Sequence, residues 1–287
     1  MNNSMIDLIG NTPLIKLKYP SELTGCNIYG KAEFMNPGGS VKDRAALGII
    51  QDAEEKKLIE PGGTVVEGTF GNTGIALTMI NNARGYKTII VMPEAASLEK
   101  RDILRNLGAE LRIVEVKPYK DPGNYQHISR RLAEELQAKG EGSVIWANQF
   151  DNTANYEFHA KTTAREIYDQ LDGKIDGFTC AVGTGGTLAG VSIGLKNKNK
   201  NIKIALSDPM GSSLYSFIKD KKLESKGTSI TEGIGTGRIT KNFEKALIDD
   251  AFQTSDEEAL NIVYDLIENQ NIILGGSSGI NIAGAIK

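Results

Sequence analysis

The sequence has few of the residues that metal sites and disulfide frameworks require. It contains two cysteines and two histidines in 287 residues. A single disulfide between Cys26 and Cys180 could not stabilise so long a chain, so we expect free thiols. Free thiols are typical of a reducing compartment, so we expect a cytoplasmic protein. We expect His127 and His159 on helix surfaces, and because they make no ligand spacing with the cysteines we predict no metal site.

Long apolar runs and an excess of one charge are also absent. No run approaches the roughly 18 apolar residues of a membrane span, and the start, MNNSMIDLIGNTPL, lacks the basic and apolar regions of a signal peptide. Lys and Arg total 33 against 36 Asp and Glu, for a net charge of −3. A nucleic-acid binder usually has a basic excess, so we expect neither a nucleic-acid nor a membrane partner.

Glycine, by contrast, is abundant. It makes up 32 of the 287 residues, above its average share of about 7%. Short β-branched runs alternate with longer helical patterns, which predicts an α/β fold with parallel sheets covered on both faces. The predicted strands are 14–17, 28–34, 64–67, 88–92, 110–116, 143–146, 177–182 and 203–207. The predicted helices are 41–57, 73–84, 98–107, 125–139, 153–171, 188–196 and 256–269.

Four glycine-rich segments each precede a helix, whose free N–H groups and partial positive charge suit an anion. In the first, Asn36–Arg44, Ser40 can cap the helix and Asp43 stands at the capping-box position. Lys42 then lies in the first turn, where the dipole disfavours its charge. A lysine whose ammonium is destabilised is a better nucleophile toward an aldehyde. The alternative is an ordinary exposed lysine on a capped helix.

The second and third segments follow predicted strands. Gly68–Gly74 could hold a carboxylate or a phosphate, or it is a tight turn capped by Thr69 or Asn72. Gly183–Thr187 has three glycines in five residues, which lets the backbone wrap an anion closely. It is not a dinucleotide fingerprint, because Leu188 stands where the third glycine should be, and no Walker lysine follows.

The fourth segment, Gly275–Gly279, matches the G-x-S-x-G pattern of hydrolase nucleophiles. In that family an acid and then a histidine follow the serine, and here no histidine follows Gly279, so we reject a hydrolase. A further run, Glu232–Gly237, has no predicted helix after it, and we interpret it as a mobile loop near a ligand.

The order and spacing of these segments resemble one family over essentially the whole chain. The matching stretches are Ile9–Leu14, Asn36–Arg44, Gly71–Gly74, Met92–Glu94, Gln149–Phe150, Gly183–Thr187, Gly233–Gly235 and Ser277–Gly279. The chain resembles the fold-type II pyridoxal-phosphate enzymes, specifically the cysteine synthase (O-acetylserine sulfhydrylase) group. The resemblance implies a two-lobed, three-layer α/β/α fold with parallel sheets, like the tryptophan synthase β-subunit. The smaller lobe would comprise 1–12 and 35–145 and the larger 13–34 and 146–287, with the cofactor between them and a shortened C-terminus.

The resemblance also implies roles for individual residues. Lys42 would be the catalytic residue, which binds pyridoxal 5'-phosphate covalently and removes the α-proton. The cofactor would further be bound through its ring hydroxyl by Asn72, through its pyridine nitrogen by Ser277, and through its phosphate by Gly183, Thr184, Gly185, Gly186 and Thr187. The substrate would be bound by Thr69, Phe70, Asn72, Thr73, Gln149 and Gly233.

The implied activity is a β-replacement that converts O-acetyl-L-serine and sulfide to L-cysteine and acetate through an aminoacrylate, catalysed by a homodimer. A serine partner would leave the pyridine nitrogen largely neutral, which suits prompt β-elimination. Phe70 replaces a serine common in the family, Gly68 replaces a proline, and Asp208–Ser212 is more similar to the cystathionine β-synthase branch. The alternatives are therefore cystathionine β-synthase or β-cyanoalanine synthase activity, or a non-catalytic pyridoxal-phosphate-binding paralogue. A nicotinamide-dependent oxidoreductase is a further alternative, against which the missing fingerprint counts.

Overall fold

The structure is a computed structural model that describes residues 4–140 and 142–287. The chain forms two compact units. Unit 1 comprises Met1–Gly10 and Glu33–Asn155, and unit 2 comprises Asn11–Ala32 and Tyr156–Lys287. The units thus divide after residues 10, 32 and 155, whereas the lobes predicted from sequence divide after residues 12, 34 and 145.

Unit 1 is built on a parallel sheet of four strands in the order β5-β4-β3-β6. The strands are β3 (Thr64–Gly68), β4 (Lys87–Pro93), β5 (Glu110–Val114) and β6 (Val144–Trp146). Its helices are α2 (Lys42–Glu55), α3 (Asn72–Arg84), α4 (Leu98–Asn106) and α5 (Tyr125–Lys139), with 3₁₀ turns η1 (Met5–Leu8) and η2 (Glu33–Met35). Every residue of β4 after Lys87 is buried, as expected for a strand of a parallel sheet covered on both faces.

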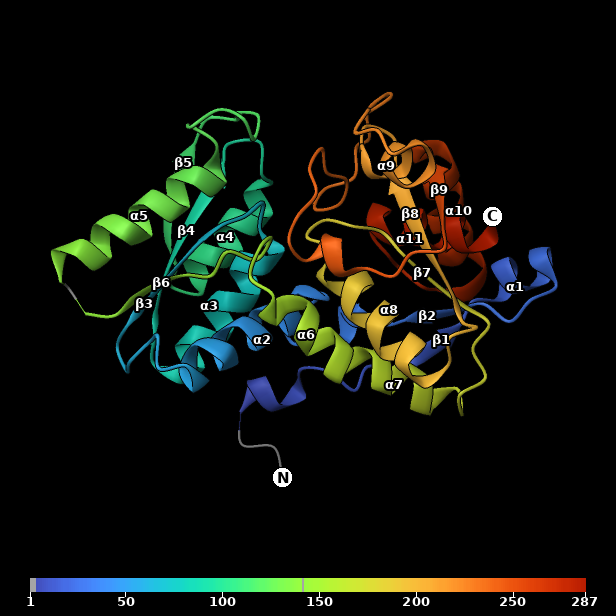
Figure 1. Ribbon diagram of the computed structural model, residues 1–287, viewed down its shortest axis with the longest axis horizontal. Coiled ribbons are helices and arrows are strands. Elements are labelled where there is room, and N and C mark those ends of the chain that lie inside the picture. Colours follow the sequence, from blue (N-terminus) through green and yellow to red (C-terminus); the bar gives the residue numbers. More distant parts are fainter. Residues whose placement is uncertain (1–3, 141) are drawn as a thin grey trace. The chain divides into compact units, whose positions relative to one another are not determined.

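Helix α5 shows how unit 1 buries its apolar surface. Asn124 caps its start and Gly140 ends it in the left-handed conformation. Leu132, Ala133 and Leu136 recur at helical spacing and pack in one cluster with Val66 and Ile89 of the sheet. The helix lies against β3, β4 and β6, while α3 packs against β4, α2 and α4 (Figure 1).

Unit 2 contains a parallel sheet of three strands in the order β7-β8-β9 and a separate antiparallel pair, β1 with β2. The strands are β1 (Leu14–Lys16), β2 (Tyr29–Lys31), β7 (Gly177–Cys180), β8 (Lys203–Pro209) and β9 (Asp250–Thr254). The helices are α1 (Lys18–Thr24), α6 (Ala154–Lys161), α7 (Thr163–Gln170), α8 (Gly186–Lys198), α9 (Leu214–Asp220), α10 (Asp256–Gln270) and α11 (Gly276–Ile286), with the 3₁₀ turn η3 (Phe243–Lys245). The first two residues of α6 belong to unit 1. Helix α11 packs against all three parallel strands (Figure 1).

The predicted α/β class with parallel sheets is confirmed, but several elements differ from expectation. The helix predicted over 153–171 is two helices, α6 and α7, which meet at Thr162. The Thr162 hydroxyl donates to the carbonyl of Phe158 at 2.7 Å, and such back-bonding is often found where a helix bends. Strand β9 was not predicted, because its sequence, DAFQT, shows no apolar alternation. Helices α1 and α9 were missed because each is only seven residues long.

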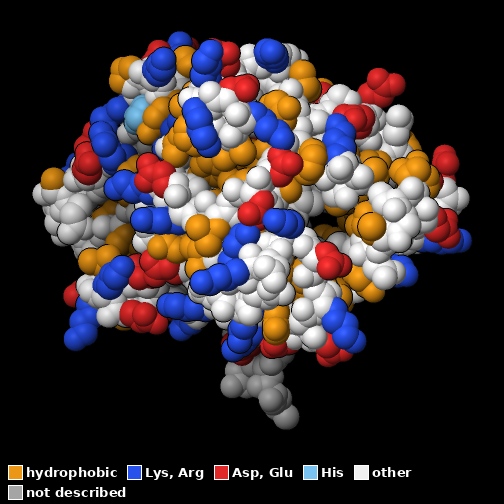
Figure 2. Space-filling view, turned by 45° about the vertical axis from the view of Figure 1, so that its right-hand side comes forward, with side chains coloured by type: hydrophobic (Ala, Val, Ile, Leu, Met, Phe, Trp, Pro, Cys, Tyr) orange, Lys and Arg blue, Asp and Glu red, His pale blue; other side chains and the backbone are white. Residues whose placement is uncertain are grey.

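The surface carries charges of both signs. On the face drawn in Figure 2, basic and acidic side chains are interspersed with apolar ones, in line with the near balance of 33 basic and 36 acidic residues. Within 4–140 and 142–287, no helix has both the length and the apolar character needed to cross a membrane.

Candidate active site

Lys42 is the first residue of α2, and the loop before it is tightly closed. The hydroxyl of Ser40 accepts the backbone N–H of Lys42 at 3.2 Å. The predicted capping box is wrong: the Asp43 carboxylate instead turns back to accept the N–H of Gly38 at 2.5 Å. Burial raises the pKa of Asp43 to about 6. A Cβ on Gly38 would lie 2.4 Å from Asp43 Oδ1, so glycine is required there for this loop to close.

A buried ion pair supports the start of α2. The Arg44 guanidinium, which is fully buried, holds Glu33 in two contacts, Nε to Oε2 at 2.7 Å and Nη2 to Oε1 at 2.9 Å. Asn36 donates to the same carboxylate at 2.9 Å and accepts the N–H of Gly10 at 2.9 Å. A bidentate pair fixes direction as well as distance, so these contacts orient the helix that begins with Lys42.

The loop after β3 holds a second group of predicted residues in unit 1. Gly71, with φ of +146°, is the N-cap residue of α3, and its N–H donates to the Thr69 hydroxyl at 3.1 Å. Thr69 therefore closes the turn, as the turn interpretation of this segment expected. No side chain caps α3, and Asn72 is exposed in its first turn. The first N–H groups of α3 thus keep their capacity to bind an anion.

Thr73 and Gln149 are brought together by the sheet. The Thr73 hydroxyl donates to Gln149 Oε1 at 2.6 Å across 76 residues of sequence, and both side chains are buried. Strands β3 and β6 are parallel neighbours, so the segments that follow them begin at the same edge. Ligands commonly bind at this edge of parallel sheets.

Phe70 uses its side chain for packing. Its ring meets Tyr125 edge to face, with centroids 5.4 Å apart and planes at 87°, a favourable arrangement for two aromatic rings. It also packs against the cluster of Ile75, Ile90 and Met92. A substrate contact at Phe70 stays a prediction, and the packing of the ring favours a contact through the backbone.

In unit 2 the glycine-rich loop between β7 and α8 forms a narrow cradle. A Cβ on Gly183 would lie 2.2 Å from the carbonyl oxygen of Gly233, and one on Gly185, which has φ of +87°, would lie 2.7 Å from the backbone of Phe243. Gly185 is also the N-cap residue of α8 and makes no side-chain cap, while the Thr184 hydroxyl accepts the N–H of Gly186 at 3.3 Å. Close backbone approach at the start of a helix fits a phosphate.

Neighbouring segments of unit 2 hold this cradle. Thr240 donates its hydroxyl to the carbonyl of Thr184 at 2.6 Å, and the N–H of Gly235 donates to Val182 at 2.7 Å. The Glu232–Gly237 run therefore lies against the end of β7. Its Gly233 and Gly235 both have positive φ, near +80°, which explains the glycines.

His159 contradicts its predicted surface position. It is 1% exposed, and its ring bridges two hydroxyls, Nδ1 to Thr163 Oγ1 at 2.9 Å and Nε2 to Thr187 Oγ1 at 3.2 Å. His159 thus orients a hydroxyl of the cradle. Its partners come from α7 and α8, so helical periodicity alone could not reveal this role. His127 is half-buried, and its Nε2 lies 2.7 Å from the carbonyl oxygen of Tyr119.

Ser277 lies in the first turn of α11 and is tied to the cradle through Asn281. The Asn281 amide donates to the carbonyl of Ser277 at 2.7 Å, and its oxygen accepts the N–H of Ala181 at 2.7 Å. Ala181 directly follows β7 and is two residues before Gly183. Sequence reasoning missed Asn281, although a lone amide between Ile280 and Ile282 on an otherwise apolar helix was a signal.

The predicted residues form two groups, one in each unit. Unit 1 holds Lys42, Thr69, Phe70, Asn72, Thr73 and Gln149, and unit 2 holds Gly183, Thr184, Gly185, Gly186, Thr187, Gly233 and Ser277. Most lie at the start of a helix or in a segment that follows a strand. Both groups offer uncapped helix starts and hydroxyls for anionic groups, and unit 1 adds an amine.

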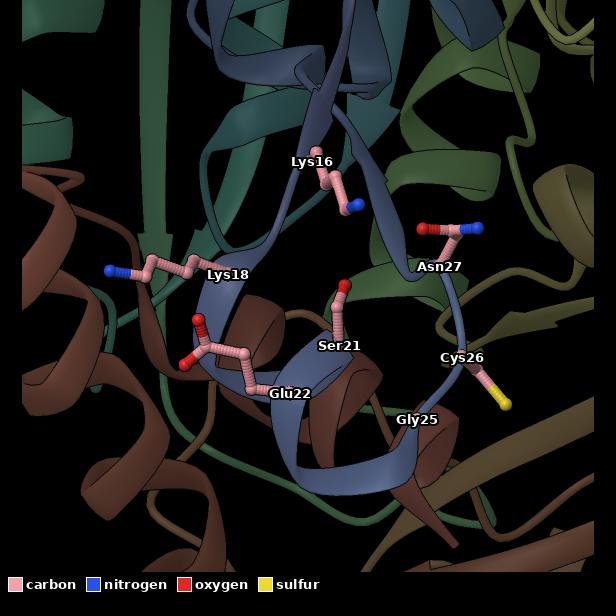
Figure 3. Close-up of a pocket in the computed structure, with 7 residues that line it drawn as sticks. All are labelled: Lys16, Lys18, Ser21, Glu22, Gly25, Cys26 and Asn27. Atoms are coloured by element: carbon pink, nitrogen blue, oxygen red, sulfur yellow. The ribbon is translucent and has the colours of Figure 1, made fainter.

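A hollow of about 490 Å³ in unit 2 contains none of these residues. Lys16 and Ser21 point into it, whereas Lys18 and Cys26 point outward (Figure 3). The Ser21 hydroxyl already donates to the carbonyl of Leu17 at 2.6 Å. We therefore assign no chemistry to this hollow.

Comparison with known proteins identifies the family. The model of the pyridoxal-phosphate dependent enzymes matches residues 5–287. Cysteine synthase 1 of Emericella nidulans is 50% identical over 99% of this chain and 76% of its own length, and a cystathionine beta-synthase of Apis mellifera is 43% identical over 99% and 55%. The crystal structure of a hydrogen sulfide-producing enzyme from Fusobacterium nucleatum is 35% identical, with a TM-score of 0.87, and the match covers 100% of this chain and 92% of that one. The chain belongs to the family of pyridoxal-phosphate dependent enzymes.

Proposed function

We infer that this protein is a pyridoxal-phosphate dependent cysteine synthase, which converts O-acetyl-L-serine and sulfide to L-cysteine and acetate. The observation that carries this inference is the 50% identity to a cysteine synthase over 99% of the chain. Of the two substrates, O-acetyl-L-serine carries an anionic carboxylate. This agrees with a chain that has uncapped helix starts in both units.

The residues of unit 2 fit the cofactor phosphate. A Cβ on Gly183 or Gly185 would collide with backbone, so this loop keeps room for a group that approaches the main chain closely. Thr184 and Thr187 add hydroxyls beside the start of α8. We assign the phosphate to Gly183–Thr187 and the pyridine nitrogen to the hydroxyl of Ser277.

The residues of unit 1 fit the reacting end of the cofactor and the substrate. We assign Lys42 Nζ to attachment of the cofactor aldehyde and, once free, to removal of the substrate α-proton as general base. The first turn of α3, with Thr73 and Gln149, would bind the substrate carboxylate. When bound, pyridoxal phosphate supplies an electron sink for the charge that develops at the α-carbon.

The direct test is product formation by the purified protein loaded with pyridoxal phosphate. We expect cysteine from O-acetyl-L-serine and sulfide. We expect Lys42→Ala to lower kcat by at least about a thousandfold, since a base and a covalent anchor are both lost. Lys57→Ala, on an exposed lysine just beyond α2, is the control and should behave as the wild type. Absence of cysteine, with the cofactor absorbance unchanged by O-acetyl-L-serine, would instead favour a non-catalytic paralogue.

Cystathionine β-synthase activity is the second candidate, favoured by the segment Asp208–Ser212 and by the 43% identity to such an enzyme. Asp208 is fully buried, and its carboxylate accepts the N–H of Tyr215 at 2.8 Å, so it organises the turn after β8. Cystathionine formed from serine and homocysteine, without cysteine formed from O-acetyl-L-serine, would replace our assignment. Cyanide in place of sulfide tests β-cyanoalanine synthase activity in the same assay.

Two further expectations concern the protein in the cell. The cysteines, Cys26 and Cys180, are free thiols, which supports the cytoplasm as the compartment. A homodimer follows from the family resemblance. Cell fractionation and light scattering of the purified protein test the two statements separately.

A further inference from the structure

A buried carboxyl, Glu67, lies directly beneath the segments assigned to the substrate carboxylate. It is the residue before the last of β3 and is 2% exposed. Its Oε2 accepts the backbone N–H of Gln149 at 3.4 Å. The carboxyl also receives hydrogen bonds from the Gln149 side chain and from the backbones of Asn148 and Gly68. Glu67 therefore joins the ends of two neighbouring strands.

These hydrogen bonds continue toward the proposed substrate. Gln149 Oε1 accepts the hydroxyl of Thr73 at 2.6 Å, and its Nε2 donates to the carbonyl of Gly68 at 3.4 Å. The carbonyl of Gln149 in turn accepts the amide of Asn155 at 2.9 Å. Gln149 is thus held from both sides, and its orientation sets that of the Thr73 hydroxyl at the start of α3.

The charged side chains on the elements around β3 lie away from Glu67. Strand β6 has none, β4 has only Lys87, which is paired with the opposite end of β3, and α3 has only Arg84 in its last turn. Asp151, in the segment after β6, is half-buried. Of the titratable and charged residues of α5, Tyr125 and His127 are half-buried and the others are exposed: Arg130, Arg131, Glu134, Glu135 and Lys139. Tyr125 lies beside Gly68, the residue after Glu67.

Burial therefore governs the charge of Glu67. It raises the pKa of Glu67 to about 8, against the smaller effect of its hydrogen bonds. The side chain is then mostly uncharged near neutral pH. An ionised Glu67 would put a second negative charge beside a site for a carboxylate, and like charges in a buried region repel strongly.

We propose that Glu67, in its uncharged form, is a positioning residue that holds Gln149 and, through it, Thr73 for binding the substrate carboxylate. This inference rests on the proposed function, because it concerns the same substrate site. It adds a residue that does not touch the substrate and a protonation state on which binding depends.

The test compares the wild-type holoenzyme with Glu67→Gln, whose side chain keeps the same shape but cannot ionise. The Kd of L-serine, a stable analogue of the substrate, is measured by calorimetry from about pH 6.5 to about pH 9.5. If only the uncharged form of Glu67 binds L-serine, the wild-type Kd divided by the Glu67→Gln Kd should rise with pH. One pH unit above the pKa of Glu67, this ratio should be about tenfold higher than it is well below that pKa. Titration of the ligand amine and of the cofactor affects both proteins equally, so its effect on Kd cancels in the ratio.

Two comparisons separate positioning from a merely structural role. With 2-aminoethanol, which is serine without its carboxylate, the ratio should stay constant with pH. Glu110→Gln, on an exposed carboxyl of β5 in the same sheet, should behave as the wild type with both ligands. A ratio for L-serine that stays constant, or that rises equally for both ligands, would overturn the proposal. Failure of L-serine to bind either protein would contradict the proposed function itself.

Discussion

Glu67, His159 and Asn281 show how single buried or half-buried polar side chains hold the binding segments. Each joins segments that are distant in sequence: Glu67 the ends of β3 and β6, His159 the helices α7 and α8, and Asn281 the start of α11 and the end of β7. A buried polar group left without partners costs about 1–3 kcal/mol. These side chains therefore favour the arrangement in which their partners are in place.

Glu67 should make stability depend on pH. Its pKa of about 8 lies above the ordinary 4.5, so the native state holds a proton that the unfolded chain releases. Its contribution to stability is fully present below about pH 4.5 and is lost as the pH rises through about 8. Compared with Glu67→Gln, the wild type should lose on the order of a few kcal/mol of unfolding free energy between about pH 5 and about pH 8.5.

Urea unfolding at each pH measures that difference. Asp43 and Asp208, whose pKa values burial raises to about 6, also titrate in this range, but they are common to both proteins and cancel. Parallel stability curves for the two proteins would show that Glu67 is ionised at neutral pH.

Replacing Asn281 should weaken cofactor binding without unfolding the chain. Asn281→Ala removes both hydrogen bonds that join Ser277 to Ala181, and each typically contributes about 0.5–1.5 kcal/mol. We expect the Kd of pyridoxal phosphate to rise about 5- to 50-fold in titrations of the apoprotein. Asn269→Ala, which removes an exposed amide on α10, is the control. Equal affinities for the two variants would contradict the link.

At the scale of elements, the helices that follow the four glycine-rich segments share one property. The N-cap residues of α2, α3, α8 and α11 make no side-chain cap hydrogen bond. The N-cap residues of α4, α5 and α10, which are Ser97, Asn124 and Ser255, do make one. The short helices α1, α7 and α9 also lack caps, so absence of a cap alone does not identify a site. The four helices of the candidate site differ from these short helices because glycine-rich segments precede them, and glycine lets a backbone or a ligand approach closely.

A substitution at Gly183 tests whether the loop before α8 needs glycine for close backbone approach. In Gly183→Ala the new methyl would lie 2.2 Å from the carbonyl oxygen of Gly233, so one backbone segment must move. We expect at least a tenfold rise in the Kd of pyridoxal phosphate, or about 1.4 kcal/mol. Gly30→Ala, where the nearest atom is 3.6 Å away and φ is not positive, should change neither affinity nor activity. Unchanged affinity in Gly183→Ala would remove the phosphate assignment.

At the scale of the whole molecule, the cofactor should stabilise the fold because it binds the native state and not the unfolded chain. A ligand that binds only the native state adds about 2.7 kcal/mol at a hundredfold excess over its Kd. For a chain of this size that corresponds to a rise in Tm of roughly 4–5 °C. Lys42→Ala should show a smaller rise because the covalent attachment is lost. Differential scanning fluorimetry with and without pyridoxal phosphate measures both, and identical Tm values for the wild-type apoprotein and holoprotein would contradict the binding assignment.

The sequence by itself determined the α/β class and the glycine-rich segments before the helices, because strand and helix periodicity and the need for glycine are local properties. It also placed Lys42 at the start of a helix. Only the tertiary structure decided that Asp43 bonds to Gly38, that Phe70 packs on Tyr125 and that His159 is buried. Those outcomes depend on partners that other elements bring alongside, and no periodicity within one segment encodes them. The carboxyl of Glu67 shows the limit most clearly: its position before a glycine loop is visible in the sequence, but its charge depends on burial beneath Gln149, which strand pairing alone provides.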